Sequence, residues 1–179
     1  MEDILDQHQS ALICVHLIVT DLRRKTFERA IKLLAAKPRS VAELRERLLR
    51  VKGSNEAVVN TVISRLQEYG YLDDERYAFS YASFKVKQRP VGRRRLARDL
   101  KFKKVETDVA NEALELVYAE TSEEQLIDQA IAKRLRIRGR PKNRAEAKSL
   151  FDHLLRQGFA FELVSEKVRA LATDYADED

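Results

Sequence analysis

The chain has 179 residues and a formal net charge of +5, and its 44% of apolar residues can form a folded core beside 35% of charged residues. Only five glycines and three prolines occur, while Leu, Ala, Arg, Glu and Lys abound, so we predict an all-α protein. The longest apolar run, ALICVHLIV, is too short to cross a bilayer and lacks a basic leader. A single cysteine, Cys14, excludes an internal disulfide, and we expect a cytoplasmic protein without a membrane partner.

Three prolines divide the chain at nearly equal intervals. Pro38, Pro90 and Pro141 lie 52 and 51 residues apart, and each ends a predicted helix, because proline cannot continue one. The positions that align after the prolines are largely apolar: Leu44 and Leu48, Leu96 and Leu100, Ala147 and Phe151. We predict an N-terminal helical extension over residues 1–22, then tandem three-helix repeats in three copies, over 23–72, 73–120 and 121–175, that form an elongated, curved array.

In chain order, the extension comes first, with apolar residues Ile4, Leu5, Leu12, Ile13, Leu17 and Ile18. Repeat one follows with the predicted helices FERAIKLLAA, SVAELRERLLR and NEAVVNTVISRLQEY. Ser40 and Glu43 have the spacing of a capping box for the second helix. Asn55 is the predicted cap of the third helix, and Gly70 ends it.

Repeat two begins with LDDERYAFSYASFKVK, a helix that we expect Asp73 to cap, with Asp74 and Glu75 at its positive end. Tyr77, Tyr81 and Phe84 recur along it at helical spacing, as an aromatic stripe that we expect to pack in the core. The second and third helices are predicted over Gly92–Lys103 and Thr107–Tyr118. Repeat three is predicted to form helices from SEEQLIDQAIAKRLRIR, RAEAKSLFDHLLRQ and ELVSEKVRALATDY.

Motifs for catalysis are missing from the sequence. It contains no phosphate-binding loop, no G-x-G-x-x-G, and no H-E-x-x-H or C-x-x-C metal spacing. His8, His16 and His153 are scattered, and the adjacent Asp73 and Asp74 point in different directions at a helix start. We therefore expect no enzyme, catalytic residue, metal site, cofactor or small-molecule substrate.

Charge is segregated along the chain. Residues 85–104 carry ten Lys or Arg against one Asp, residues 106–131 carry eight acids and no base, and residues 132–148 carry eight bases against one Glu. Such blocks suit an anionic partner at one place and a basic one at another.

RPVGRRRLARDL, residues 89–100, is the densest basic stretch. Leu96 and Leu100 mark its buried side, Arg94, Arg98 and Lys101 form an outward stripe, and Arg95 is placed to pair with Asp99. Like charges at this spacing repel, which favours a binding role for phosphate or for an acidic protein surface. The candidate partner-binding or nucleic-acid-binding residues are Lys85, Lys87, Arg89, Arg93, Arg94, Arg98, Lys101, Lys103, Lys104, Arg138, Arg140 and Lys142.

Repeat one also supports an alternative. SVAELRERLLR followed by GSNEAVVNTVISRLQEYGYL has the helix, turn, helix order of a winged helix, as in a direct DNA-binding transcription factor. Two strands around a glycine turn should follow as the wing. DDERYAFSYASFKVK instead continues with helical spacing, which argues against this alternative.

Three segments resemble one family. GYLDDERYAFSYASFKVKQRPVGRRRLARDLKFKKV is similar to the signature segment of the RecX family of RecA regulators, LLRQGF resembles the third-repeat motif of that family, and FERAIKLLAAKPRSVAELRERLLR resembles its opening repeat. The family's usual Gly-x-Gly-Pro before the arginine helix is Arg89-Pro90-Val91-Gly92 here. Residues 1–22 have no assigned counterpart.

The resemblance covers roughly residues 27–172. It implies tandem three-helix repeats and a non-enzymatic protein that binds RecA recombinase, especially its filament on single-stranded DNA. Such binding modulates, and mainly inhibits, the recombinase and ATPase activities of RecA in recombination, DNA repair and the SOS response. Single-stranded or duplex DNA is an open alternative partner for the basic patches.

Overall fold

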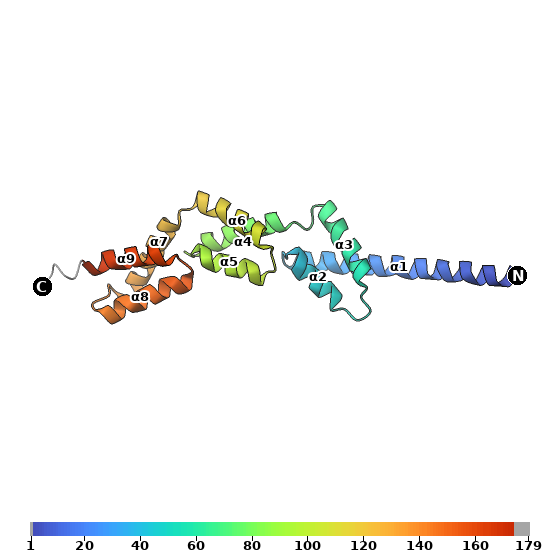
Figure 1. Ribbon diagram of the computed structural model, residues 1–179, viewed down its shortest axis with the longest axis horizontal. Helices are drawn as coiled ribbons and strands as arrows, with labels where there is room; N and C mark the ends of the chain where they lie inside the picture. Colours follow the sequence, from blue (N-terminus) through green and yellow to red (C-terminus); the bar gives the residue numbers. More distant parts are fainter. Residues whose placement is uncertain (1, 174–179) are drawn as a thin grey trace. The chain divides into compact units, whose positions relative to one another are not determined.

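The computed structural model describes the backbone of residues 2–173 and the side chains of residues 19–171. Within residues 2–173 all regular elements are α-helices, nine in number, which confirms the predicted all-α class (Figure 1). They are α1 (Glu2–Ala36), α2 (Val41–Leu49), α3 (Glu56–Glu68), α4 (Asp74–Gln88), α5 (Arg93–Phe102), α6 (Thr107–Glu120), α7 (Glu123–Arg138), α8 (Arg144–Gln157) and α9 (Phe161–Thr173). In this part of the chain no helix combines the length and the apolarity that a membrane span needs.

The prolines punctuate the helices as predicted. Helices α1, α4 and α7 end two or three residues before them. The second helix of every repeat has its N-cap two residues after the proline, at Ser40, Gly92 and Asn143. Ser40 Oγ accepts a hydrogen bond from the Glu43 N–H at 3.1 Å, and Asn143 Oδ1 accepts one from the Glu146 N–H at 3.0 Å. Gly92 has no side chain with which to do the same.

Helix α1 is continuous from residue 2 to residue 36, so the extension and the first helix of repeat one form one element. The predicted apolar residues Ile4, Leu5, Leu12, Ile13, Leu17 and Ile18, with Cys14, His8 and His16, lie outside the residues whose side chains are described. No proline or glycine interrupts the sequence near residue 22, which is why nothing ends the helix there.

The chain divides into two compact units, Met1–Asp74 and Glu75–Asp179. The core of the first unit is formed by α1, α2 and α3, with Ala30, Leu44, Leu48, Val59 and Leu66 fully or almost fully buried. Helix α3 begins and ends as predicted. Its cap, Asn55, accepts from the Val58 N–H at 3.2 Å, and Gly70 follows the helix at φ +68°.

Asp74 has a role that differs from the expected one. Its Oδ1 accepts a hydrogen bond at 2.8 Å from the backbone N–H of Val41, the first residue of α2. The carboxylate therefore stabilises the positive end of α2, although the sequence suggested the start of its own helix.

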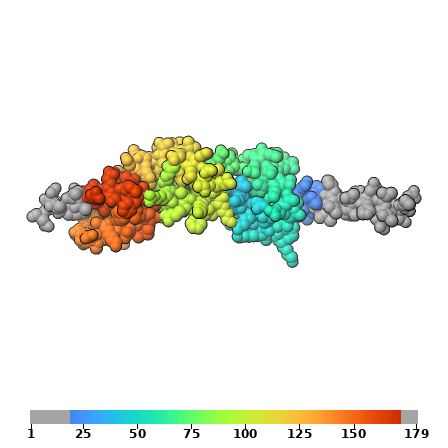
Figure 2. All heavy atoms as spheres, in the orientation of Figure 1, coloured from blue at the N-terminus to red at the C-terminus, as the bar shows by residue number. Residues whose placement is uncertain are grey.

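The second unit holds repeats two and three around a single core. Leu96 and Leu100 of α5, Leu114 of α6, Ile127 of α7 and Leu154 of α8 are all fully buried in it. Figure 2 shows the green and yellow atoms of repeat two adjoining the orange and red atoms of repeat three. Because the two repeats bury one common core, their surfaces are fixed relative to each other.

Helix α4 occupies the place where a winged helix would have the two strands of its wing. The winged-helix alternative therefore lacks its strands.

The aromatic stripe predicted for α4 is only partly buried. Tyr77 and Tyr81 stack with ring centroids 6.1 Å apart beside the core, but Phe84 is 58% exposed, so the predicted stripe is wrong at this residue. The buried row of α4 is Ala78, Ala82 and Val86. A helix turns about 100° per residue, and Phe84 therefore faces away from that row.

Candidate partner-binding surface

Helix α5 presents its bases to solvent on one side. Leu96 and Leu100 are 0% exposed, whereas Arg94, Arg98 and Lys101 are all exposed, as their spacing predicted. We call these three residues the α5 surface. The periodicity of two leucines four residues apart was enough to define its direction.

The charges of the α5 surface are poorly neutralised. Arg94 Nη2 lies 3.9 Å from Glu162 Oε2, and both side chains are mostly exposed, so this pair is weak. Arg98 Nε donates to the Arg94 carbonyl oxygen at 3.3 Å, and no acid among residues 19–171 forms an ion pair with it. Among the described side chains none pairs with Lys101 Nζ. The surface therefore keeps most of its positive charge for a partner.

Arg93 and Arg95 are turned inward instead. The Arg93 guanidinium contacts the Glu115 carboxylate of α6, and this hydrogen bond lowers the pKa of Glu115. Arg95 Nη1 lies 3.4 Å from Gln157 Oε1 of α8, rather than pairing with Asp99 as expected. Both arginines therefore hold α5 in place, and we leave Arg93 out of the α5 surface.

The N-terminus of α5 is clamped by backbone contacts to repeat three. The Gly92 N–H donates to the Gln157 carbonyl at 3.0 Å, and the Arg94 N–H donates to the Gly158 carbonyl at 3.0 Å. A Cβ on Gly92 would lie 2.2 Å from the Gly158 carbonyl carbon, and one on Gly158 would lie 2.4 Å from Arg95 Cβ. Only glycine permits this approach at either position, and Gly158 also has φ +93°.

Two side chains complete the clamp. Glu123 Oε1 of α7 accepts from the Arg93 N–H at 3.0 Å. The Tyr118 hydroxyl of α6 donates to the Val91 carbonyl at 2.8 Å, and burial, followed by the nearby Glu123, raises the pKa of Tyr118. With its first N–H groups used inside the protein, α5 can reach an anion only through its side chains.

The remaining candidate bases fall into two groups within the second unit. Beside α5, Lys85 Nζ lies 5.4 Å from the Tyr81 ring centroid, Lys87 and Arg89 are exposed, Lys103 is half-buried, and Lys104 is exposed at φ +60°. In repeat three Arg138, Arg140 and Lys142 are exposed around the α7–α8 loop. The first group thus belongs to repeat two and the second to repeat three.

Sequence reasoning missed the partners that orient α5. These partners, Glu115, Tyr118 and Glu123, lie in the acidic block of residues 106–131. The charge pattern indicated that this block contacts bases, but it did not indicate which residues pair. Gly158 stands inside LLRQGF, yet nothing periodic links it to Gly92. Among the described residues no three of His, Cys, Asp and Glu gather in an arrangement that could hold a metal ion.

Comparison with known proteins gives a consistent set of matches. The model described as RecX, first three-helix domain, matches residues 27–66, and that described as RecX, second three-helix domain, matches residues 73–114. The Regulatory protein RecX of Amycolatopsis mediterranei is 30% identical over 150 residues, which cover 82% of this chain and 85% of the relative. The protein of that name from Bacillus licheniformis is 28% identical over 156 residues, or 87% of this chain and 58% of the relative. The chain thus matches less than two thirds of the Bacillus protein.

Solved structures agree on the fold. The crystal structure of RecX from Lactobacillus salivarius matches with a TM-score of 0.75 and 20% identity, over 86% of this chain and 99% of that one. A second crystal structure, of a regulatory protein RecX, matches with a TM-score of 0.74 and 19% identity, over 88% of this chain and 76% of that one.

Proposed function

The chain belongs to the RecX family, and from that premise we propose that it binds the RecA recombinase, above all its filament on single-stranded DNA, and inhibits its recombinase and ATPase activities. In this proposal it is a cytoplasmic regulator, not an enzyme, and acts in recombination, DNA repair and the SOS response. The family to which it belongs is one of regulatory proteins.

The observation that supports the site is the poorly neutralised α5 surface. Three exposed bases along one side of a clamped helix attract an anionic surface. The core that repeats two and three share keeps the two repeats from moving apart when a partner binds. Arg94 and Arg98 fit the acidic side chains of a filament subunit, and α6, with Asp108 and Glu112 exposed, fits a basic one. Binding should weaken as salt rises.

The test replaces Arg94, Arg98 and Lys101 with Glu and measures suppression of RecA ATPase on single-stranded DNA across a salt series. We expect the variant to fold like the wild type, because all three side chains are exposed, and to lose at least about tenfold in inhibitory potency, which corresponds to about 1.4 kcal/mol of binding free energy.

The matched control is Arg29→Glu, Lys32→Glu and Lys37→Glu, which makes the same change in charge at three exposed bases of the first unit. We expect this control to inhibit almost as well as the wild type. Equal inhibition by the α5 variant would refute the site. Failure of the wild-type chain to inhibit would refute the proposed activity itself.

A further inference from the structure

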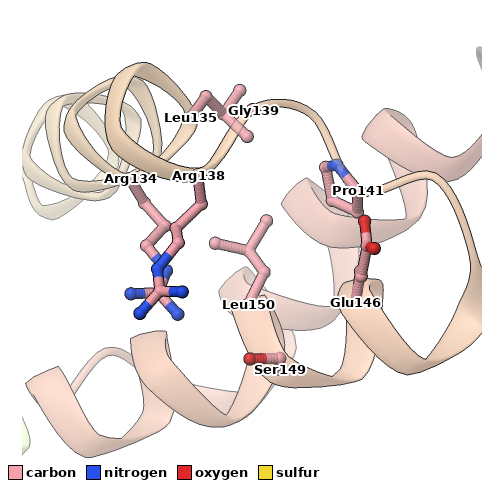
Figure 3. Close-up of a pocket in the computed structure, with 8 residues that line it drawn as sticks. All are labelled: Arg134, Leu135, Arg138, Gly139, Pro141, Glu146, Ser149 and Leu150. Carbon is pink, nitrogen blue, oxygen red and sulfur yellow. The ribbon is translucent and has the colours of Figure 1, made fainter.

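Repeat three contains a pocket that the α5 surface does not include. It has a volume of about 220 Å³ and lies between α7, its following loop and α8. Figure 3 shows the side chains of Arg134 and Arg138 extending from α7 toward α8, with Leu150 rising from α8 beside them. Ser149 lies on α8 below, and Pro141 and Glu146 form the other end.

The two arginines carry charge that the protein does not neutralise. They stand four residues apart on α7, where like charges repel. Within residues 19–171 neither has an ion pair or a side-chain hydrogen bond. Their field is felt nearby: burial first, then Arg134 and Arg156, lower the pKa of His153. An anion in the pocket would relieve the repulsion.

Glu146 does not supply that anion. Its Oε2 accepts from the Lys142 N–H at 2.8 Å and its Oε1 lies 3.4 Å from Asn143 Nδ2, so both carboxylate oxygens are directed at the loop before α8. In Figure 3 this carboxylate lies beside Pro141, away from the two guanidinium groups. The arginine end of the pocket is therefore left for a ligand.

We propose that this pocket binds a phosphate group of a polynucleotide backbone, held by the guanidinium groups of Arg134 and Arg138 and by the Ser149 hydroxyl. The two non-bridging oxygens of a phosphodiester diverge, so that each can accept from one of the two guanidinium groups, and the planar fork of arginine suits such paired oxygens. Leu135 and Leu150 supply apolar walls on which a sugar ring can rest.

The surroundings favour a polymer over a free phosphate. Residues 132–148 carry eight bases against Glu146 alone, and Lys133, Arg136, Arg144 and Lys148 among them are exposed. A polyanion that seats one phosphate in the pocket gains from this whole field, while a single phosphate ion gains mainly from two arginines. The site requires no recombinase, so it stands independently of the proposed function.

His153 offers a direct reporter. Bound phosphate would cancel part of the Arg134 field and so raise the pKa of His153, which NMR titration of the imidazole protons follows in the full chain. The probe is a short oligothymidylate at low salt, and fluorescence anisotropy of the labelled oligomer gives its affinity. Inorganic phosphate and an oligoglutamate peptide of equal charge are titrated in parallel.

The pocket variant is Arg134→Gln with Arg138→Gln. Its matched control, Lys133→Gln with Arg136→Gln, removes the same charge from exposed positions of the same helix outside the pocket. We expect the pocket variant to bind the oligomer about tenfold more weakly and to lose about 0.7 in salt slope for each phosphate contact removed. The control should change affinity less than threefold. A third variant, Arg134→Lys with Arg138→Lys, keeps the charge without the forks and should fall between the two.

Four outcomes decide the matter. A rise in the His153 pKa with the oligomer, abolished in the pocket variant only, supports the proposal. An equal rise with inorganic phosphate at the same concentration overturns the polynucleotide source in favour of free phosphate. An equal rise with oligoglutamate overturns phosphate in favour of an acidic protein. An unchanged pKa with all three probes overturns the site.

Discussion

Helices α2 and α5 occupy the same place in repeats one and two but treat their bases in opposite ways. Each buries two leucines four residues apart, Leu44 with Leu48 and Leu96 with Leu100. The bases of α2 and of its C-cap meet acids: Arg45 contacts Glu56, Arg47 lies 3.4 Å from Glu43, and the C-cap Arg50 lies 2.8 Å from Glu46. Among residues 19–171, the acid that approaches the α5 surface is Glu162, whose carboxylate lies 3.9 Å from Arg94. The arginines at α2 are thus matched by acids of their own repeat, whereas the α5 surface is mostly unmatched.

The N-termini of α2 and α5 are also stabilised in different ways. Ser40 caps α2 with its own hydroxyl, so α2 needs little from outside its unit. Gly92 leaves α5 without a side-chain cap, and the Gly158 carbonyl supplies the acceptor instead. Local stabilisation of α2 is replaced in α5 by a contact that joins two repeats.

Exchanging the two caps gives the largest expected effect. Serine is among the best N-cap residues, yet Gly92→Ser should destabilise the protein by about 3 kcal/mol, because its Cβ would meet the backbone of Gly158 and Phe159, which cannot move aside. Urea unfolding followed by circular dichroism measures the change.

The reverse exchange is the control. Ser40→Gly should cost only a few tenths of a kcal/mol, since glycine is itself a tolerated N-cap. If Gly92→Ser were neutral or stabilising, the clamp between α5 and repeat three would not exist as described.

Replacing the bases of α2 and of the α5 surface should change the free energy of unfolding by a smaller amount. Arg45→Gln with Arg47→Gln and Arg50→Gln should destabilise the protein by about 1 kcal/mol, because three ion pairs of about 0.3–0.5 kcal/mol each are lost. The same change at Arg94, Arg98 and Lys101 should leave stability within about 0.5 kcal/mol. Thermal unfolding in low salt compares the two sets, and equal losses would mean that the α5 surface is neutralised after all.

The sequence predicted what depends on local rules. Prolines and caps such as Asn55 gave the helix boundaries, and Leu96 with Leu100 gave the direction of the α5 surface. These features need only residues within a few positions of one another.

What the sequence left open depends on distant contacts. The contact of Gly92 with Gly158 joins loops in different repeats, and periodicity carries no information about it. The pairing of Arg93 with Glu115 depends on how α6 packs on α5, and several acids of that block would have satisfied the charge pattern equally well. The prediction for Phe84 failed for a local reason. The buried row of α4 consists of the smaller residues Ala78, Ala82 and Val86, whose pattern is less conspicuous than that of the aromatic side chains.

The smallest predicted effect is a pH dependence of stability that arises from His153, which lies near unneutralised arginines of the second unit. His153 has its pKa lowered from 6.5, first by burial and then by Arg134 of α7 and Arg156 of α8. The unfolded chain therefore binds the proton more readily, so the contribution of His153 is complete above pH 6.5 and is lost as pH falls toward the lowered value. Relative to His153→Gln, the wild type should lose stability between about pH 7 and pH 5.5. Urea unfolding at both pH values measures this, and Arg134→Gln should shrink the loss, because one of the two opposing charges is gone. A loss of the same size with and without Arg134 would show that the charge of Arg134 does not lower the pKa of this histidine.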